Sequence, residues 1–146
     1  MIYAYIITFV CMVMYVLGPV YAYGTTSGHI DHMLYGISHA NALHLGLNMY
    51  ALWMFRPRGL TCLVGAIISI VASYLPLAAY DLPTCGLSAF LMACFARRYA
   101  AWGKNILPVL CAQIILIPFP YINAAVHLYS FIIGYIVWYG IYSRSA

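Results

Sequence analysis

Long runs without a charged side chain are the strongest constraint on this sequence. The first run covers residues 2 to 23, which as a helix is long enough to cross a bilayer core of about 30 Å. Over the whole chain, 66% of the residues are hydrophobic and 5% are charged, whereas soluble domains carry about 25% charged residues. The sequence therefore predicts an all-α integral membrane protein and excludes a water-soluble domain.

Five further apolar runs follow, separated by short segments that hold prolines and charges. The predicted spans cover residues 2 to 23, 39 to 55, 60 to 79, 86 to 97, 105 to 117 and 121 to 142. The fourth run is too short to cross a bilayer at about 1.5 Å per residue, so we expect it to begin below the surface, beside a cavity. Residues 24 to 38 are predicted to form a loop outside the hydrocarbon. Together these elements form one predicted membrane domain over residues 1 to 146.

The charges are few and divide between the two sides of this predicted bundle. Because consecutive spans alternate in direction, the basic residues fall on one side and the acidic residues on the other. The basic residues are Arg56, Arg58, Arg97, Arg98, Lys104 and Arg144, and the acidic ones are Asp31 and Asp81. The positive-inside rule makes the basic side cytoplasmic and places both termini there. We expect a multi-pass protein of the plasma membrane whose surroundings are the lipid bilayer; a net charge of +4 spread this thinly does not indicate nucleic-acid binding.

Polar side chains interrupt the second run in the segment HANALHLGLN, His39 to Asn48. Unsatisfied polar groups in a membrane cost several kcal/mol, so such groups indicate a site. On a helix through this segment, His44 and Asn48 share a face, while His39 points about 140° away. Two neutral donors with no acid beside them suit a developing negative charge better than a metal ion.

Ser88 and His127 are the other polar side chains that point to chemistry. Ser88 opens the fourth helix, where unpaired backbone N–H groups favour an anion. Counted from the basic ends at the helical rise, Asn48 lies about 12 Å and Ser88 about 14 Å deep, and His127 lies about 9 Å below the opposite surface. A serine and a histidine buried at one depth are the parts of an acyl-transfer site.

Small residues on the fourth and sixth runs predict close packing of these two helices. They are Ala89, Ala93 and Ala96 on the fourth run, and Ser130 and Gly134 on the sixth. Small side chains let helix backbones approach closely in membranes. This approach is what a hydrogen bond between Ser88 and His127 requires.

Each candidate also has a structural interpretation. A lone serine in a membrane helix commonly bonds to a backbone carbonyl or packs as a small residue, and a lone histidine can be a satisfied core group. His29 and His32 could be metal ligands or solvated loop residues. The five cysteines are odd in number and never spaced as CxxC, so we expect no disulfide framework, zinc site or other cofactor.

Three motifs, in this order, resemble those of the rhomboid intramembrane serine proteases. The segment HANALHLGLN resembles the family's second-helix motif of two histidines and an asparagine. GLSA, residues 86 to 89, is similar to its Gly-x-Ser-Gly nucleophile motif, and His127 with Gly134 is similar to its sixth-helix histidine and glycine. The resemblance covers most of the chain, from His39 to about Gly134.

The resemblance implies a fold and a set of roles. It implies a six-helix rhomboid-like bundle that cuts transmembrane segments of membrane-protein substrates near the outer face. Ser88 would be the nucleophile and His127 the general base, without a buried acid and without metal. The implied oxyanion hole consists of His44, Asn48 and the Ser88 N–H. The residues that would support these motifs are His39, Gly86, Ala89, Ser130 and Gly134.

The sequence departs from the family pattern at several positions. The first loop is short and has no Trp-Arg pair, Ala89 replaces the motif's second glycine, Met92 stands where an aromatic residue commonly packs, and Ser130 replaces a glycine. The principal alternative is therefore an inactive rhomboid-like protein that binds transmembrane clients without cutting them. A more distant alternative is a metal or haem membrane protein using His29, His32, His39 and His44.

Overall fold

The computed structural model describes residues 1–22, 27–75, 84–116, 118 and 122–143, and their fold is all-α. These residues form seven α-helices and a 3₁₀-helix, and no named strand occurs among them. The helices are α1 (Ile2–Leu17), α2 (His29–Leu34), η2 (Tyr35–Ile37), α3 (Ala42–Phe55), α4 (Leu60–Ser73), α5 (Ser88–Trp102), α6 (Leu107–Leu116) and α7 (Ala124–Ser143). The all-α prediction is thus confirmed for the described residues.

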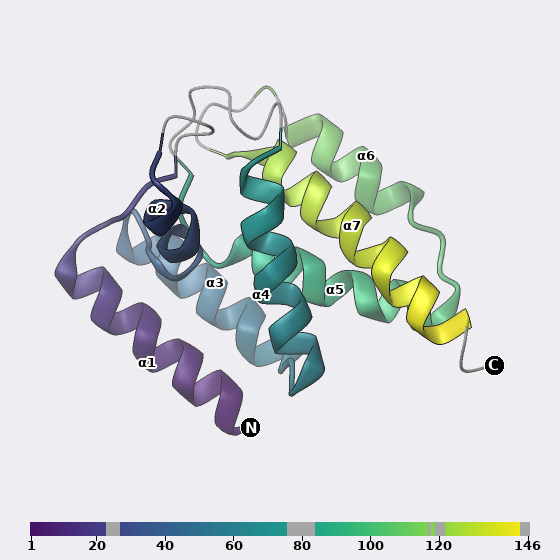
Figure 1. Ribbon diagram of the computed structural model, residues 1–146, viewed down its shortest axis with the longest axis horizontal. Helices are drawn as coiled ribbons and strands as arrows, with labels where there is room; N and C mark the ends of the chain where they lie inside the picture. The colour runs from purple at the N-terminus through teal and green to yellow at the C-terminus, as the bar shows by residue number, and fades with distance from the viewer. Residues whose placement is uncertain (23–26, 76–83, 117, 119–121, 144–146) are drawn as a thin grey trace.

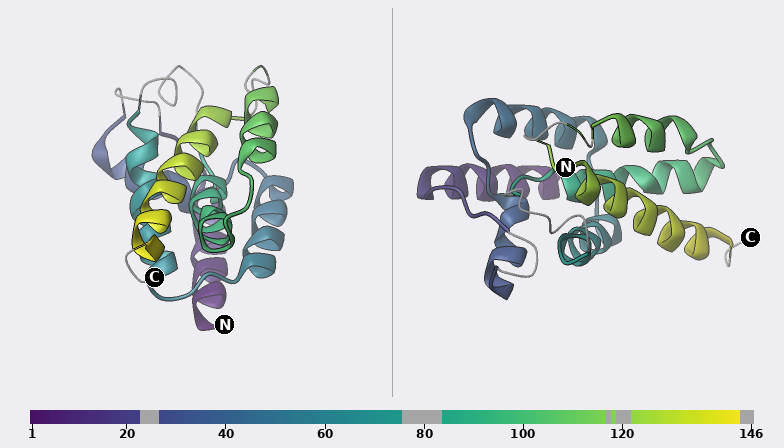
Figure 2. Two further views of the ribbon diagram at one scale, coloured as in Figure 1. Left: turned by 90° about the vertical axis from the view of Figure 1, so that its right-hand side faces the viewer. Right: turned by 90° about the horizontal axis from the view of Figure 1, so that it is seen from above.

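Helix α5 is the common partner of α3, α4 and α7. It packs against all three, and α4 also packs against α7. Figure 1 shows α5 behind α4 and α7, with α1 on the opposite side of the molecule from α6. The views in Figure 2 show α6 at the outer edge of the bundle, where it packs on α7. Helix α5 is therefore positioned to connect groups carried by α3 and α7.

A glycine sets the close approach of α5 and α7. A Cβ atom added at Gly134 would lie 3.0 Å from the Ala93 carbonyl oxygen and 3.1 Å from the Ala96 Cβ. Ala93 and Ala96 are fully buried. Gly134, Ala93 and Ala96 therefore do meet as predicted, and a larger residue at position 134 would force the helices apart.

The segment between the first two long helices is not simply a loop, and that prediction was wrong. Within residues 24 to 38 the structure forms α2 and η2. Asp31 stabilises the start of α2, because its carboxylate accepts a hydrogen bond from the Gly28 N–H at 3.0 Å. His32 anchors α2 to α4: its Nδ1 lies 2.8 Å from Ser73 Oγ, and its ring stacks on Tyr74.

The start of α3 also differs from the prediction. The helix begins at Ala42 instead of His39 because Asn41 is its N-cap, accepting a hydrogen bond from the His44 N–H at 2.9 Å. The predicted end at Phe55 is confirmed, and the next residue, Arg56, has a φ of 46°. His39 thus precedes the helix, so the predicted 140° angle between His39 and His44 does not apply.

Helices α1, α3, α4, α6 and α7 are shorter than the predicted spans. The predicted end of the fourth helix at residue 97 was wrong, because α5 continues to Trp102 and ends at the left-handed C-cap Gly103. Among the described residues, α7 alone is long and apolar enough to cross a membrane, while α1, α4 and α6 are shorter apolar helices. Helix α1 ends at Leu17, six residues before the predicted end at residue 23, because Gly18 has a φ of 109° and Pro19 follows it. Asp81 and Arg144, which were predicted to lie on opposite sides of the membrane, are outside the described residues.

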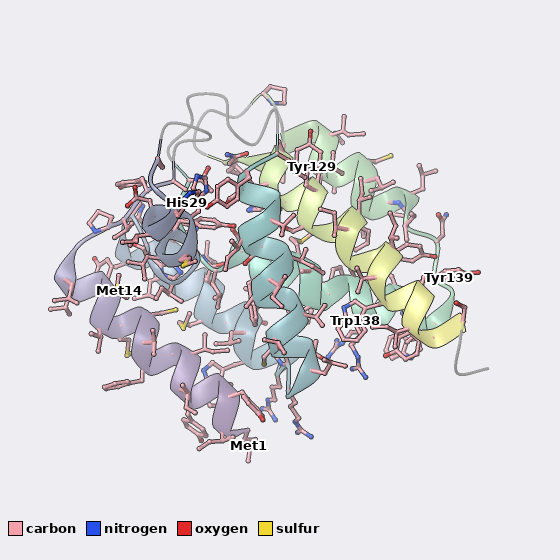
Figure 3. All side chains as sticks on the ribbon, in the orientation of Figure 1. Met1, Met14, His29, Tyr129, Trp138 and Tyr139 are labelled. Atoms are coloured by element: carbon pink, nitrogen blue, oxygen red, sulfur yellow. The ribbon has the colours of Figure 1, made fainter. Side chains whose placement is uncertain are left out.

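Large apolar side chains cover the outside of the bundle. Side chains project from the outer faces of α1 and α7 in Figure 3, where Met1 and Tyr139 are labelled, and both are exposed. Other exposed members of this surface are Phe9, Val16, Leu43, Leu47, Leu63, Ile67, Ile114, Ile115 and Ile136. They come from α1, α3, α4, α6 and α7, so the apolar surface extends over most of the helices.

Candidate active site

Ser88 and His127 are in direct contact. His127 Nε2 lies 2.6 Å from Ser88 Oγ, which is a hydrogen-bond distance. Ser88 is the first residue of α5 and His127 lies in the first turn of α7. When Nδ1 carries the imidazole proton, Nε2 accepts the hydrogen bond from the serine hydroxyl and can take its proton. This geometry is compatible with a nucleophile and its base in acyl transfer.

Backbone hydrogen bonds fix residues 84 to 86, the segment that leads into Ser88. The Gly86 N–H donates to the Tyr35 carbonyl oxygen at 2.8 Å. Thr84 and Ala22 exchange two backbone hydrogen bonds of 2.9 and 3.1 Å. These contacts fix the start of α5 against the segment between α1 and α3.

Asn123 connects this segment to the helix that carries His127. Its side-chain amide donates to Thr84 Oγ1, and its carbonyl oxygen accepts from the Val126 N–H at 3.2 Å. The second bond caps the start of α7. Asn123 therefore sets the position of His127 relative to Ser88, a role that the sequence analysis missed. An asparagine just before an apolar run signals the cap of α7, but not the bond to Thr84.

The four candidate polar side chains line one cavity at this site. The cavity has a volume of about 600 Å³, and Ser88, His127, His44 and Asn48 all line it. No Asp or Glu occurs among its lining residues in the described part of the chain. The structure thus brings together the four residues singled out from the sequence, on α3, α5 and α7.

The His44 ring lies directly against the turn before Ser88. A Cβ atom added at Gly86 would lie 2.5 Å from His44 Cε1, 2.6 Å from His44 Nε2 and 3.3 Å from Asn48 Nδ2. Gly86 also has a φ of +112°, a conformation that residues with a Cβ rarely adopt. Only glycine therefore fits at this position, and its small size lets the His44 ring reach the start of α5.

Three hydrogen-bond donors are available beside Ser88. Asn48 is buried, and its Nδ2 donates one hydrogen to the His44 carbonyl oxygen at 3.1 Å, which leaves its second amide hydrogen for a ligand. The His44 ring supplies another donor in the tautomer that protonates the nitrogen facing the cavity. The Ser88 backbone N–H, at the first position of α5, has no intrahelical acceptor.

The prediction that His39 points away from His44 was wrong, because the two rings are in contact. The His39 ring is fully buried, and it meets the His44 ring edge-on at a centroid distance of 5.2 Å. The difference arises because His39 lies in the segment before α3, where helical spacing does not hold. His39 therefore packs behind a candidate oxyanion donor.

The remaining predicted residues have packing positions around the site. Ala89 is buried and lines the cavity next to Ser88. Ser130 is fully buried on α7, one turn after His127, and Met92 is half-buried on α5.

His29 and His32 lie apart from this cavity. His29 Nδ1 lies 2.9 Å from the Tyr74 hydroxyl, and His32 bonds to Ser73, so both histidines attach α2 to α4. Neither residue lines the cavity that holds His44. The described ranges contain no group of three or more His, Cys, Asp or Glu side chains arranged to hold a metal ion.

No family model, curated protein or solved structure matches this chain. The chemistry of the site therefore rests on its own geometry. Cys85 is another nucleophilic side chain among the described residues that line the cavity. Burial raises the pKa of the Cys85 thiol, so its sulfur stays protonated near neutral pH and is a weak nucleophile.

Proposed function

We propose that this protein is a serine protease of the rhomboid type that cuts transmembrane segments of membrane-protein substrates. The observation that carries the proposal is the 2.6 Å contact between Ser88 Oγ and His127 Nε2, within a cavity that His44 and Asn48 also line. Nucleophile, base and oxyanion donors are the three groups that acyl transfer to serine requires. The motif resemblance of His39–Asn48, residues 86 to 89 and His127 agrees with this assignment.

The proposed reaction proceeds through an acyl-enzyme. Ser88 Oγ attacks the scissile carbonyl carbon while its proton passes to His127 Nε2. The oxyanion that forms accepts hydrogen bonds from His44, Asn48 and the Ser88 N–H. His127 then gives the proton to the leaving amine as the C–N bond breaks, and water, deprotonated by His127, hydrolyses the Ser88 ester.

We place the protein in a membrane on the basis of its surface. Soluble monomers rarely expose apolar patches larger than a few hundred Å², yet exposed Phe, Leu, Ile and Val side chains occur on α1, α3, α4, α6 and α7. The proposed architecture is a six-span bundle of α1, α3, α4, α5, α6 and α7, with α2 outside the hydrocarbon. Helix α6 has ten residues, about 15 Å, so the bilayer beside it would have to thin.

The site is open to this apolar surface. Leu43 and Leu47 on α3 line the cavity and are 73% and 61% exposed. A substrate helix lying in the membrane could therefore approach Ser88 past apolar side chains without first leaving the lipid. This route favours a transmembrane segment over a soluble peptide as the substrate.

The proposed topology predicts opposite labelling of two exposed positions. In a cysteine-free background, Ile30→Cys in α2 is expected to react with an impermeant maleimide from outside intact cells, and Asn105→Cys only after the membrane is opened. The reason is that Asn105 follows the basic end of α5, which the positive-inside rule places in the cytoplasm. Labelling of both positions from the same side would contradict the six-span topology.

The activity can be tested with purified protein in liposomes that also contain a model transmembrane peptide. We expect wild-type protein to release two peptide fragments, identified by mass spectrometry, and Ser88→Ala to retain the peptide uncut. The alternative function, binding of transmembrane clients without cleavage, predicts that wild type and Ser88→Ala both bind the peptide and neither cuts it. Cleavage by wild type at an equal rate to Ser88→Ala would also contradict the proposal.

A further inference from the structure

We propose that a second cavity, formed by four arginines, binds the phosphate of an anionic lipid headgroup. The cavity has a volume of about 520 Å³. Its lining includes Arg56, Arg58, Arg97 and Arg98, together with Phe55 and Met54. It lies at the end of the molecule where α3 passes into α4, close to the N-terminus in Figure 1. The cavity shares no lining residue with the candidate active site.

Three of the arginines are held in place by the protein. Arg56 Nε donates to the Trp53 carbonyl oxygen at 2.9 Å. The Arg97 guanidinium lies 5.6 Å from the centroid of the Trp138 ring, and that of Arg98 lies 5.3 Å from the Phe55 ring. Such stacking restrains the side chains, so less conformational entropy is lost when an anion binds. A guanidinium fork also matches two phosphate oxygens at once.

In the described part of the chain, no carboxylate lines the cavity to neutralise these four charges. The only carboxylate side chains in the sequence are Asp31 and Asp81. Asp31 bonds to Gly28 at the start of α2, at the opposite end of the molecule from the α3–α4 connection. Four cations around one cavity repel one another, and an anion in the cavity would relieve that repulsion.

A lipid fits this cavity better than free phosphate does. In the proposed membrane orientation, which this step takes from the proposed function, the arginines lie at the cytoplasmic interface, where anionic headgroups concentrate. Leu60 and Leu63 are exposed apolar residues at the start of α4, next to the α3–α4 connection. Acyl chains could lie beside them. Soluble phosphate would use the arginines but not this apolar surface. A bound lipid would join the ends of α3 and α5, whose other ends carry His44 and Ser88.

The test measures lipid binding to the full chain in a neutral detergent by native mass spectrometry. We expect wild type to retain phosphatidylglycerol in preference to phosphatidylcholine. Two basic side chains near a membrane surface contribute enough for Arg58→Gln/Arg98→Gln to weaken phosphatidylglycerol binding by about thirtyfold. The control, Lys104→Gln, removes one positive charge outside the cavity lining and is expected to bind like wild type. Its charge-matched counterpart, Arg58→Gln, is expected to bind phosphatidylglycerol more weakly.

Each other outcome overturns the proposal. Equal binding by the Arg58→Gln/Arg98→Gln and control variants would show that the cavity is not the site. Equal retention of phosphatidylcholine would show that the anionic charge is not recognised, and millimolar glycerol 3-phosphate that displaces the lipid completely would make free phosphate the ligand. If the glutamine variant does not fold, Arg58→Lys/Arg98→Lys replaces it. The lysine variant keeps the positive charge but lacks the two-pronged guanidinium groups, so we expect it to bind phosphatidylglycerol more weakly than wild type. Unchanged binding by this variant would overturn the proposal.

The proposals of a lipid site and of a protease site can be contradicted separately. Ser88→Ala is expected to bind phosphatidylglycerol as wild type does, because Ser88 is not part of the arginine cavity. A protein that binds the lipid but cuts nothing would overturn the protease alone. A protein that cuts a transmembrane peptide but shows no preference for phosphatidylglycerol would overturn the lipid site alone.

Discussion

Replacing Ser88 or His127 by alanine is expected to lower the turnover of a transmembrane substrate by about 10⁴- to 10⁶-fold, the range seen when a serine nucleophile or its base is removed. The two residues act as one unit through the hydrogen bond between Ser88 Oγ and His127 Nε2. The double variant should therefore lose about as much activity as either single variant, and the two losses should not multiply. Rates of peptide cleavage in liposomes, with the melting temperature of each variant, provide the measurement.

Independent losses would contradict this pairing. If the double variant lost the product of the two single effects, Ser88 and His127 would not share one proton transfer. If His127→Ala kept full turnover in a folded protein, another group would be the base. The fold should tolerate Ser88→Ala well, since a partly exposed hydroxyl is replaced by a good helix former.

His44→Ala and Asn48→Ala are each expected to lower kcat by about 10² to 10³, because one lost oxyanion donor typically has this effect. KM should change little, since the negative charge that these donors bind exists only in the transition state. Both residues line the cavity with Ser88, and Gly86 brings the His44 ring against the start of α5. Steady-state kinetics on a transmembrane peptide separates the two parameters.

A matched control exists on the same helix. Tyr50 is 69% exposed on α3 and does not line the cavity, so Tyr50→Ala should leave kcat close to that of wild type. A folded His44→Ala or Asn48→Ala variant with wild-type kcat would remove that residue from the oxyanion hole. An effect on KM alone would assign it to substrate binding instead.

The site was more predictable than the boundaries of the helices around it. Ser88 and His127 could be found because a polar side chain in an apolar run is unusual, and because small residues marked where α5 and α7 approach. The end of α3 was predictable from the segment Arg56–Gly59, whose charges, proline and glycine end a helix. These are local signals, which one sequence carries by itself.

The errors arose where a local signal was present but not used. Asn41 before an apolar run marked the start of α3, and Asp31 three residues after Gly28 marked the start of α2. Because Asn41 caps α3, His39 lies before the helix, and its ring does not take the face that helical spacing predicts. The contact of His39 with His44 then had to come from the structure.

Other features depend on contacts between distant segments and could not be predicted from spacing. Asn123 bonds to Thr84 across 39 positions, and Gly86 bonds to Tyr35. No helical or turn spacing in the sequence predicts which distant residue bonds to Asn123 or to Gly86. The same holds for the arginine cavity, which combines the α3–α4 connection with the last part of α5.

Reaction of Ser88 with a fluorophosphonate is the most direct test of the proposed site. This reagent labels a serine only when a base activates the hydroxyl and donors receive the developing oxyanion. We predict labelling of wild-type protein at Ser88, no labelling of Ser88→Ala or His127→Ala, and normal labelling of Cys85→Ala. A folded wild-type protein that takes up no reagent, or takes it up equally in Ser88→Ala, would contradict the account.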